Sequence, residues 1–208
     1  MDLRKQIVRD GYNAVAEKYA KARRLGPRER TCVEKFGAHM PSSARILDLG
    51  CGNGEPHLAA MVARGFRVTG VDFSHEQVIR ARARCPTATV VEGDFSEVEF
   101  PPAAFDAVLA YDSIFHVPRE EHAALFARIR RWLIEAGIAL ITLGFTPEGA
   151  GGELRTDHLG APTFYDAWPL KTSVDLLGAA GLTLVDCNIE PNLGGVEGGH
   201  VILLVRGD

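Results

Sequence analysis

The amino-acid sequence predicts a doubly wound α/β fold, in which helices cover both faces of a largely parallel sheet. Short runs of Val, Ile, Leu and Ala, which are typical of strands buried on both faces, alternate along the chain with segments of helical periodicity. A glycine-rich turn at 50–54 follows one of these runs and precedes a helical segment. This order of strand, glycine turn and helix is typical of nucleotide-binding α/β domains.

Two helices are expected before the first strand. The first covers Leu3–Tyr19, where apolar residues recur at helical spacing, and the second covers Arg28–Met40. Gly26 and Pro27 precede the second helix and Pro41 follows it, which indicates where that helix begins and ends.

Strands and helices then alternate along the rest of the chain. The strands are expected at 45–49, 67–71, 88–92, 105–110 and 138–143, and the helices between them at 55–64, 75–84 and 119–132. A glycine-rich loop at 149–152 precedes a helix at 172–180 and two further strands at 182–189 and 200–206. Glycines at 194, 195, 198 and 199 allow a loop between those two strands.

Composition indicates one globular domain over residues 1–208. Hydrophobic residues make up 46% of the chain and charged residues 24%, unlike the composition of disordered proteins. No apolar run reaches the roughly 18 residues that a membrane helix needs, and the N-terminus lacks the apolar core of a signal peptide. The four cysteines form no close pair, as in reduced intracellular proteins. We therefore expect a cytoplasmic protein with no membrane partner and no metal site.

Charge argues against a general nucleic-acid binder, because the net charge is −4 and the isoelectric point is near 6.0. Residues 1–30 differ from the rest, since they hold nine Lys or Arg and four acids. This local excess suits either an acidic partner or a solvated helix face. No nucleic-acid partner is expected.

The turn after the first strand reads Asp48-Leu49-Gly50-Cys51-Gly52-Asn53-Gly54. Glycine lets a ligand approach the backbone, and the start of the next helix offers unpaired N–H groups. A dinucleotide fingerprint would need its third glycine at position 55, but Glu55 stands there, beside the place of a pyrophosphate. A zwitterionic amino-acid tail suits this turn better. Cys51 is interpreted as a small residue in a tight turn rather than a nucleophile.

The same turn matches the first motif of the class I S-adenosylmethionine-dependent methyltransferases, D/E-x-G-x-G-x-G, at every defined position. The chain resembles this family over about residues 40 to 145. Segments that resemble the second to fifth strands of the family follow in the right order, although Glu135-Ala136-Gly137 replaces the usual Pro-Gly-Gly; these segments are 68–74, 92–95, 105–108 and 135–141.

The resemblance implies a cofactor and an architecture. The cofactor would be S-adenosylmethionine, and the sheet would be Rossmann-like, with seven strands that are mostly parallel and an antiparallel last strand. The chain would then divide into N-terminal lid helices (1–41), a cofactor-binding core (42–145), and a substrate cap with a C-terminal hairpin (146–208).

Acids at the ends of the first three strands are the main cofactor candidates. Asp72 lies 22 residues after Gly50, where a carboxylate accepts hydrogen bonds from both ribose hydroxyls; alternatively, it interacts with the dipole of the next helix. By resemblance, Asp94 binds the adenine amine, and Asp48 either binds the cofactor ammonium group or fixes the glycine turn. With their neighbours, the expected cofactor-binding residues are Tyr19, Asp48, Gly50, Cys51, Gly52, Asp72, Phe73, Asp94, Phe95 and Ala110.

Aromatic residues are candidates on several sides of the cofactor. Phe73 and Phe95 suit either the adenine face or the apolar core. Tyr12 and Tyr19 are seven residues apart and share one helix face, and their segment resembles the lid helix of small-molecule methyltransferases; core packing is the alternative. Two arginines that follow are candidates for the cofactor carboxylate, Arg23 and Arg24.

His116 is the expected catalytic residue. Methyl transfer from a sulfonium needs alignment and the exclusion of water, and it needs a base only where the acceptor carries a proton. His116 follows the fourth strand, and histidine has a pKa suited to proton removal near neutral pH. The alternative is a structural histidine near a helix start.

Aromatic residues in the segment 163–168 indicate a substrate cap, because such side chains are costly in a loop unless they are buried or bind a ligand. The expected substrate-binding residues are Tyr12, Tyr111, His116, Tyr165, Trp168 and His200. His158 and Glu197 are further polar candidates, for which a surface or hairpin position is the alternative.

The sequence therefore predicts an S-adenosylmethionine-dependent methyltransferase that acts on an oxygen or nitrogen atom of a small molecule, such as a biosynthetic intermediate. A monomer or homodimer is expected. Two alternatives stay open: a non-catalytic module that binds S-adenosylmethionine, and an NAD-dependent Rossmann oxidoreductase, against which Glu55 counts.

Overall fold

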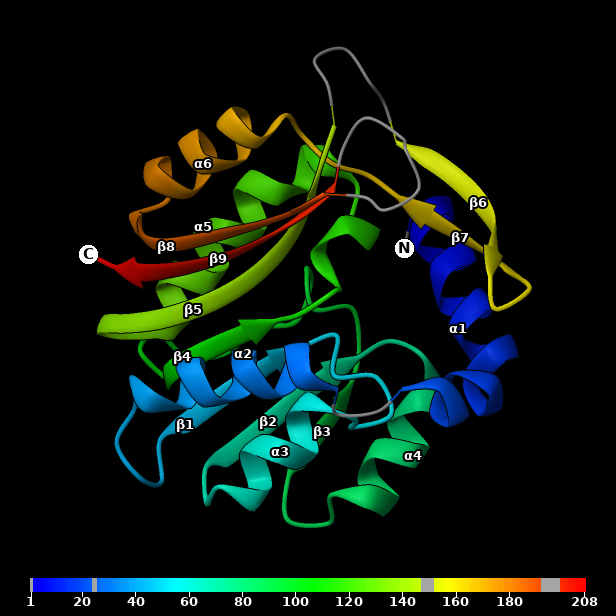
Figure 1. Ribbon diagram of the computed structural model, residues 1–208, viewed down its shortest axis with the longest axis horizontal. Helices are drawn as coiled ribbons and strands as arrows, with labels where there is room; N and C mark the ends of the chain where they lie inside the picture. Colours follow the sequence, from blue (N-terminus) through cyan, green and yellow to red (C-terminus); the bar gives the residue numbers. More distant parts are fainter. Residues whose placement is uncertain (1, 24–25, 147–151, 192–198) are drawn as a thin grey trace.

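The computed structural model describes residues 2–23, 26–146, 152–191 and 199–208 and is built around a seven-stranded sheet (Figure 1). The strand order is β3-β2-β1-β4-β5-β9-β8. Neighbouring strands from β3 to β5 are parallel, whereas β9 is antiparallel to both β5 and β8, so the predicted seven-stranded sheet is confirmed. Its strands are Arg45–Leu49 (β1), Arg67–Asp72 (β2), Thr89–Glu92 (β3), Phe105–Ala110 (β4), Leu133–Phe145 (β5), Leu182–Pro191 (β8) and Gly199–Gly207 (β9).

Two helices cover one face of the sheet. They are α5 (His122–Trp132) and α6 (Leu170–Ala179), and their apolar side chains, among them Phe126 and Leu177, form one core with buried residues of β4, β5 and β9. The short 3₁₀ helices η1 (Ile114–His116) and η2 (Arg119–Glu121) lie between β4 and α5.

Three helices cover the opposite face. They are α2 (Pro27–Ala38), α3 (His57–Ala63) and α4 (His75–Arg84), and they bury side chains such as Phe36 and Met61 against the other side of β1, β2 and β4. Helices on both faces of a mostly parallel sheet confirm the predicted doubly wound fold. Helix α3 begins at His57 rather than at residue 55, because residues 55 and 56 form a turn.

The fifth strand differs from its prediction. It begins at Leu133, directly after α5, whereas the sequence predicted a turn at 135–137 and a strand from 138. The turn is present as an irregularity within the strand: Ala136 has a φ of 56°, and the pairing with β4 steps from Leu133 to Ile138. A bulge of this kind lets the chain re-enter the sheet in register.

A two-stranded antiparallel hairpin, which the sequence did not predict, follows the sheet. It consists of β6 (Glu153–His158) and β7 (Ala161–Tyr165) within the segment expected to be a substrate cap. Leu159 and Gly160 form its turn with φ values of 54° and 92°. A two-residue hairpin turn of type I′ needs positive φ at both central residues, for which leucine is an unusual choice. The glycine-rich loop expected at 149–152 and the loop expected around 194–198 lie almost wholly outside the described residues.

The N-terminal helix α1 (Leu3–Ala22) lies beside β7 rather than on a face of the sheet (Figure 1). Contact between the two is very close at Gly11, where an added Cβ would lie 2.2 Å from the carbonyl oxygen of Pro162. Glycine in the middle of this helix is therefore explained by packing, since only a residue without a side chain allows this approach.

Replacing Gly11 with Ala should destabilise the protein, although the same change favours an isolated helix by about 1 kcal/mol. The clash with the Pro162 carbonyl oxygen must push α1 away from the hairpin, and overpacking of this kind costs about 1–3 kcal/mol. Thermal unfolding of the variant checks this expectation.

Gly178→Ala in α6 is the matched control, because an added Cβ there meets no atom within 4 Å. It should stabilise the protein by roughly 0.5–1 kcal/mol. Equal stabilisation by both substitutions would contradict the packing of α1 against β7.

Candidate active site

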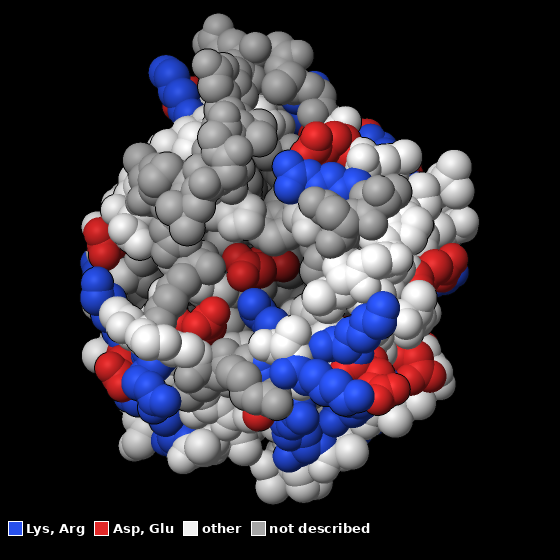
Figure 2. Space-filling model, turned by 45° about the vertical axis from the view of Figure 1, so that its right-hand side comes forward, with Lys and Arg blue, Asp and Glu red and all other residues white. Residues whose placement is uncertain are grey.

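A cavity lies at the carboxyl ends of the parallel strands, lined by α1 and by the segments that follow β1 to β4. Helix α1 contributes to its wall, and Figure 2 shows acidic side chains within a hollow of this face. Most predicted site residues line this cavity, namely Tyr12, Tyr19, Asp48, Gly50, Cys51, Gly52, Asp72, Phe73, Asp94, Phe95, Tyr111 and His116.

The glycine turn is shaped by its backbone and by Asp72. Gly50, Gly52 and Gly54 all have positive φ, at 77°, 53° and 87°, a region that other residues rarely adopt. The Asp72 carboxylate accepts a hydrogen bond from the Gly52 N–H at 2.8 Å and another from the Ser74 N–H at 2.9 Å. Asp72 therefore joins the turn to the start of α4, where Ser74 is the helix cap.

The two acids nearest the turn are buried. Burial raises the pKa of Asp48 to about 7, and the negative charge of Asp72 adds to this shift. Burial also raises the pKa of Asp72 to about 6, against the lowering effect of the hydrogen bonds from Ser74 and Gly52. Negative charge is thus costly in this part of the cavity, so a ligand that brings positive charge is complementary to it.

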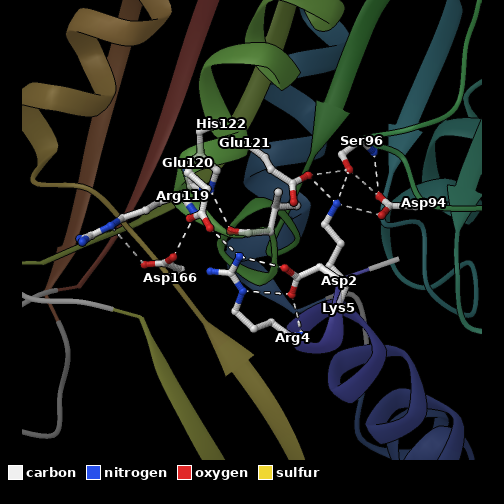
Figure 3. Close-up of polar contacts among 11 residues, drawn as sticks. Asp2, Arg4, Lys5, Asp94, Ser96, Arg119, Glu120, Glu121, His122 and Asp166 are labelled. Carbon is white, nitrogen blue, oxygen red and sulfur yellow. Dashed lines mark hydrogen bonds and ion pairs between the residues drawn. The ribbon is translucent and has the colours of Figure 1, made fainter.

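Lys5 connects α1 to the third acid, Asp94 (Figure 3). Its ammonium nitrogen lies 3.0 Å from Oδ2 of Asp94, 2.5 Å from Oε2 of Glu121 and 2.7 Å from Oγ of Ser96. Although burial lowers the pKa of Lys5, the carboxylates of Glu121 and Asp94 raise it overall, so the ammonium keeps its charge. Arg4 adds a bridge to Glu120 at 2.5 Å.

The excess of basic residues over 1–30 predicted an acidic partner or a solvated face, and Lys5 was not expected in the cavity. The Lys5 side chain is only 4% exposed and forms an ion pair with Asp94, the acid expected to bind adenine. No local pattern signals this contact, because residues 5 and 94 are far apart in the sequence. Asp94 also accepts hydrogen bonds from the N–H and hydroxyl of Ser96.

His116 is buried in the cavity wall and bonded through both ring nitrogens. Nδ1 lies 2.7 Å from the carbonyl oxygen of Phe164, and Nε2 lies 3.0 Å from the Tyr12 hydroxyl oxygen. A carbonyl oxygen only accepts, so Nδ1 carries the proton of the neutral ring and Nε2 accepts from Tyr12. The predicted catalytic and lid residues thus meet, although they are 104 positions apart.

The other predicted residues do not line the cavity. Tyr165 lies 4.8 Å from the His116 ring and stacks on Phe115 at 5.3 Å, and His200 stacks on Phe115 at 5.0 Å. Trp168 donates its ring N–H to the carbonyl oxygen of Arg119. Ala110 is buried at the end of β4. Arg24 and Glu197 lie outside the described residues, as does the side chain of His158.

Several cavity residues were not expected as site residues. His57 packs its ring 4.1 Å from that of Tyr111, and Glu55 lies 3.8 Å from the Arg84 guanidinium. Arg23, one of the two candidate arginines, also lines the cavity, 3.8 Å from the Asp112 carboxylate. The remaining unexpected lining residues are Val8, Ser113 and Val117.

Comparison with known proteins shows what the central part of the chain is similar to. Residues 46–137 match the family model described as "Methyltransferase domain". Over 136 residues, the chain is 40% identical to the 27-O-demethylrifamycin SV methyltransferase of Amycolatopsis mediterranei (strain S699), a match that covers 61% of this chain and 49% of that protein. The chain is therefore similar to methyltransferases over its central part. It spans about half the length of this relative.

Solved structures agree on the fold. An S-adenosylmethionine-dependent methyltransferase from Methanosarcina mazei superposes with a TM-score of 0.71 at 16% identity, covering 83% of this chain and 96% of that one. The 1,6-didemethyltoxoflavin-N1-methyltransferase of Burkholderia thailandensis, solved with 1,6-didemethyltoxoflavin and S-adenosylhomocysteine, has a TM-score of 0.67 at 24% identity, covering 97% and 91%.

The cavity residues fit S-adenosylmethionine, the cofactor that the sequence predicts. Two buried acids, Asp48 and Asp72, complement the cationic groups of its methionine end and the hydroxyls of its ribose. Gly52 lines the cavity with a positive φ, and an added Cβ there would already touch Tyr19 at 3.6 Å. Within the described residues, no group of His, Cys, Asp and Glu is placed to hold a metal, and no helix is long and apolar enough to cross a membrane.

Asp48→Asn should flatten the pH dependence of stability in the ligand-free protein. The folded chain keeps on Asp48 a proton that the unfolded chain releases near pH 3.8, because the folded pKa is about 7. The contribution of Asp48 to the free energy of unfolding therefore falls as pH rises from about 4 to about 7 and is then constant. The melting temperature of the parent should fall more steeply than that of the variant over this interval, as thermal unfolding at stepped pH would measure. Parallel curves would contradict the buried state of Asp48.

Lys5→Met should lower stability by about 3 kcal/mol, because it leaves the Asp94 and Glu121 carboxylates without their shared cation. Denaturant unfolding measures the change. Lys171→Met is the matched control: its pair with Asp175 is largely exposed, and loss of such a pair changes stability by less than about 1 kcal/mol. Similar effects of the two substitutions would show that Lys5 contributes no more than a surface charge.

Proposed function

We propose that this chain transfers the methyl group of S-adenosylmethionine to an oxygen or nitrogen atom of a small molecule. The observation that carries the proposal is one cavity in which the acids and glycines of the cofactor motif face the histidine that follows the fourth strand. S-adenosylmethionine, when bound, supplies an electrophilic methyl group, so the protein must hold it, orient the acceptor and remove a proton where the acceptor has one.

Each predicted cofactor residue has a role that its position supports. Asp72 accepts from the ribose hydroxyls with the lone pairs that its two backbone hydrogen bonds leave, and Asp48 faces the ammonium group. The Asp94 carboxylate, which pairs with Lys5, binds the adenine amine, and Phe73 and Phe95 lie near the adenine ring. Backbone groups of the glycine turn and Tyr19 complete the cavity set, whereas Ala110, which does not line the cavity, stays a prediction.

A small acceptor is favoured by the cover over the cavity. Helix α1 lines it and packs on the hairpin β6–β7, so the space beside His116 is bounded by buried side chains. The name of the rifamycin relative describes methylation at an oxygen, and that of the toxoflavin enzyme at a nitrogen. Both support a small-molecule acceptor without choosing its atom. Tyr165, Trp168 and His200 stay predictions as substrate-binding residues, as do the cytoplasmic location and the monomeric or dimeric state.

The alternative functions are distinguished by ligand and by turnover. An NAD-dependent oxidoreductase is disfavoured, because Glu55 lies in the cavity wall at the position where the dinucleotide motif has glycine. A non-catalytic module would bind S-adenosylmethionine equally well but would not need a base beside the methyl position.

Titration with S-adenosylhomocysteine in a calorimeter should give a 1:1 isotherm, and NAD should give none. Asp72→Ala should weaken the affinity by at least about 30-fold, because two hydrogen bonds to a charged group are worth about 2–5 kcal/mol together. Asp175→Ala, at an exposed helix position, is the control and should bind like the parent. Tight NAD binding would refute the proposed function, and an unchanged affinity of Asp72→Ala would refute the ribose role.

A further inference from the structure

We infer that Tyr12 of the N-terminal helix is a second catalytic residue, which takes the proton of a hydroxyl acceptor and passes its own proton to His116. The inference rests on the proposed function and extends it from one base to a two-residue relay. It starts from the 3.0 Å contact between the Tyr12 hydroxyl oxygen and Nε2 of His116.

The hydrogen bond at the other ring nitrogen of His116 fixes the direction of this one. The backbone carbonyl of Phe164 occupies Nδ1 of His116 at 2.7 Å and can only accept, so the proton of the neutral ring stays on Nδ1. Nε2 is then the basic nitrogen, and Tyr12 is the donor to it. A histidine held in one tautomer by a carbonyl on its other nitrogen is arranged as a general base.

Tyr12 is suited to transfer a proton rather than to hold a charge. Its side chain lines the cavity and is surrounded by rings, with Tyr19 at 5.5 Å and His116 at 5.4 Å between ring centroids. Burial raises the pKa of Tyr12 well above its ordinary value, which keeps the phenol neutral. A neutral hydroxyl both donates and accepts, which a relay requires.

The proton transfer balances without any further reactant. The acceptor O–H bond breaks and its proton goes to the Tyr12 oxygen, while the Tyr12 proton goes to Nε2 of His116. The bonding electron pair stays on the acceptor oxygen, which becomes the nucleophile, and the imidazole becomes an imidazolium that later loses its proton to water. Nothing is oxidised or reduced.

The acceptor class follows from the side chains that surround the relay. The residues around His116 are aromatic, with Phe115 at 4.8 Å and Tyr165 at 4.8 Å between centroids. The described cations that line the cavity, Lys5 and Arg23, lie against acids. The site therefore suits an uncharged hydroxyl compound such as a phenol rather than a carboxylate or phosphate.

The test uses 4-nitrophenol, whose ionised form absorbs visible light, with protein saturated by S-adenosylhomocysteine. At a pH about one unit below the probe's own pKa, binding to the parent should increase the ionised fraction. In Tyr12→Phe and in His116→Gln the ratio of ionised to neutral bound probe should fall by about tenfold, one unit of apparent pKa. His122→Gln, at a buried histidine outside the cavity lining, is the matched control and should retain the parent signal.

Calorimetry separates the two proposals. Failure of the parent to bind S-adenosylhomocysteine would refute the proposed function. Normal binding of it, with no saturable signal from the probe or with an undiminished signal in Tyr12→Phe, would overturn the relay alone.

A measurement on the parent protein covers the case in which a variant fails to fold. Long-range ¹H–¹⁵N correlation spectra of His116 should show the Nδ1–H form before the probe is added and the imidazolium after it. A ring that stays neutral on saturation with the probe would overturn the relay.

Discussion

The burial of negative charge at the carboxyl ends of the parallel strands is the constraint on which the rest of the site depends. Because β1 and β2 are parallel neighbours, Asp48 and Asp72 meet at one edge of the sheet, and burial raises the pKa of both. Asp72 recovers part of the cost through two backbone N–H groups. The remaining cost favours a ligand that brings positive charge to this edge.

Helix α1 supplies cations to acids that lie outside the helix. Its first turn supplies Lys5 to Asp94 and Glu121, and the residue at its C-terminal end, Arg23, lies beside Asp112. A helix that packs against the hairpin rather than on the sheet is thus held by charge at both ends and by the close contact at Gly11 between them. Ion pairs therefore join helix α1 to acids of the cavity.

The parts of the fold that repeat a local pattern could be predicted from the sequence, and the parts that depend on distant contacts could not. Strand composition and the glycine turn were sufficient for the alternating α/β core and for Asp48 and Asp72, and the resemblance to methyltransferases added Asp94 and the seven-stranded order. The hairpin β6–β7 was missed because its turn begins with Leu159, which is not a turn-forming residue.

Lys5 and the bond between His116 and Tyr12 were missed for a different reason. Each joins residues about 90 to 100 positions apart, so neither leaves a local pattern. The sequence identified both His116 and Tyr12 as candidates but not their contact, because helical periodicity gives the face of a helix and not what the face meets.

The hydrogen-bond acceptor that orients the His116 ring is the backbone carbonyl of Phe164 and not a side chain. A substitution at position 164 cannot remove a main-chain oxygen. Mutations of hairpin side chains therefore leave the hydrogen bond that sets the tautomer of His116 in place. The hairpin side chains can then diverge among descendants of this chain, and with them the shape offered to an incoming molecule, while the ring keeps its orientation. The orientation of His116 is thus robust to mutation, whereas the side chains of the hairpin beside it are free to vary.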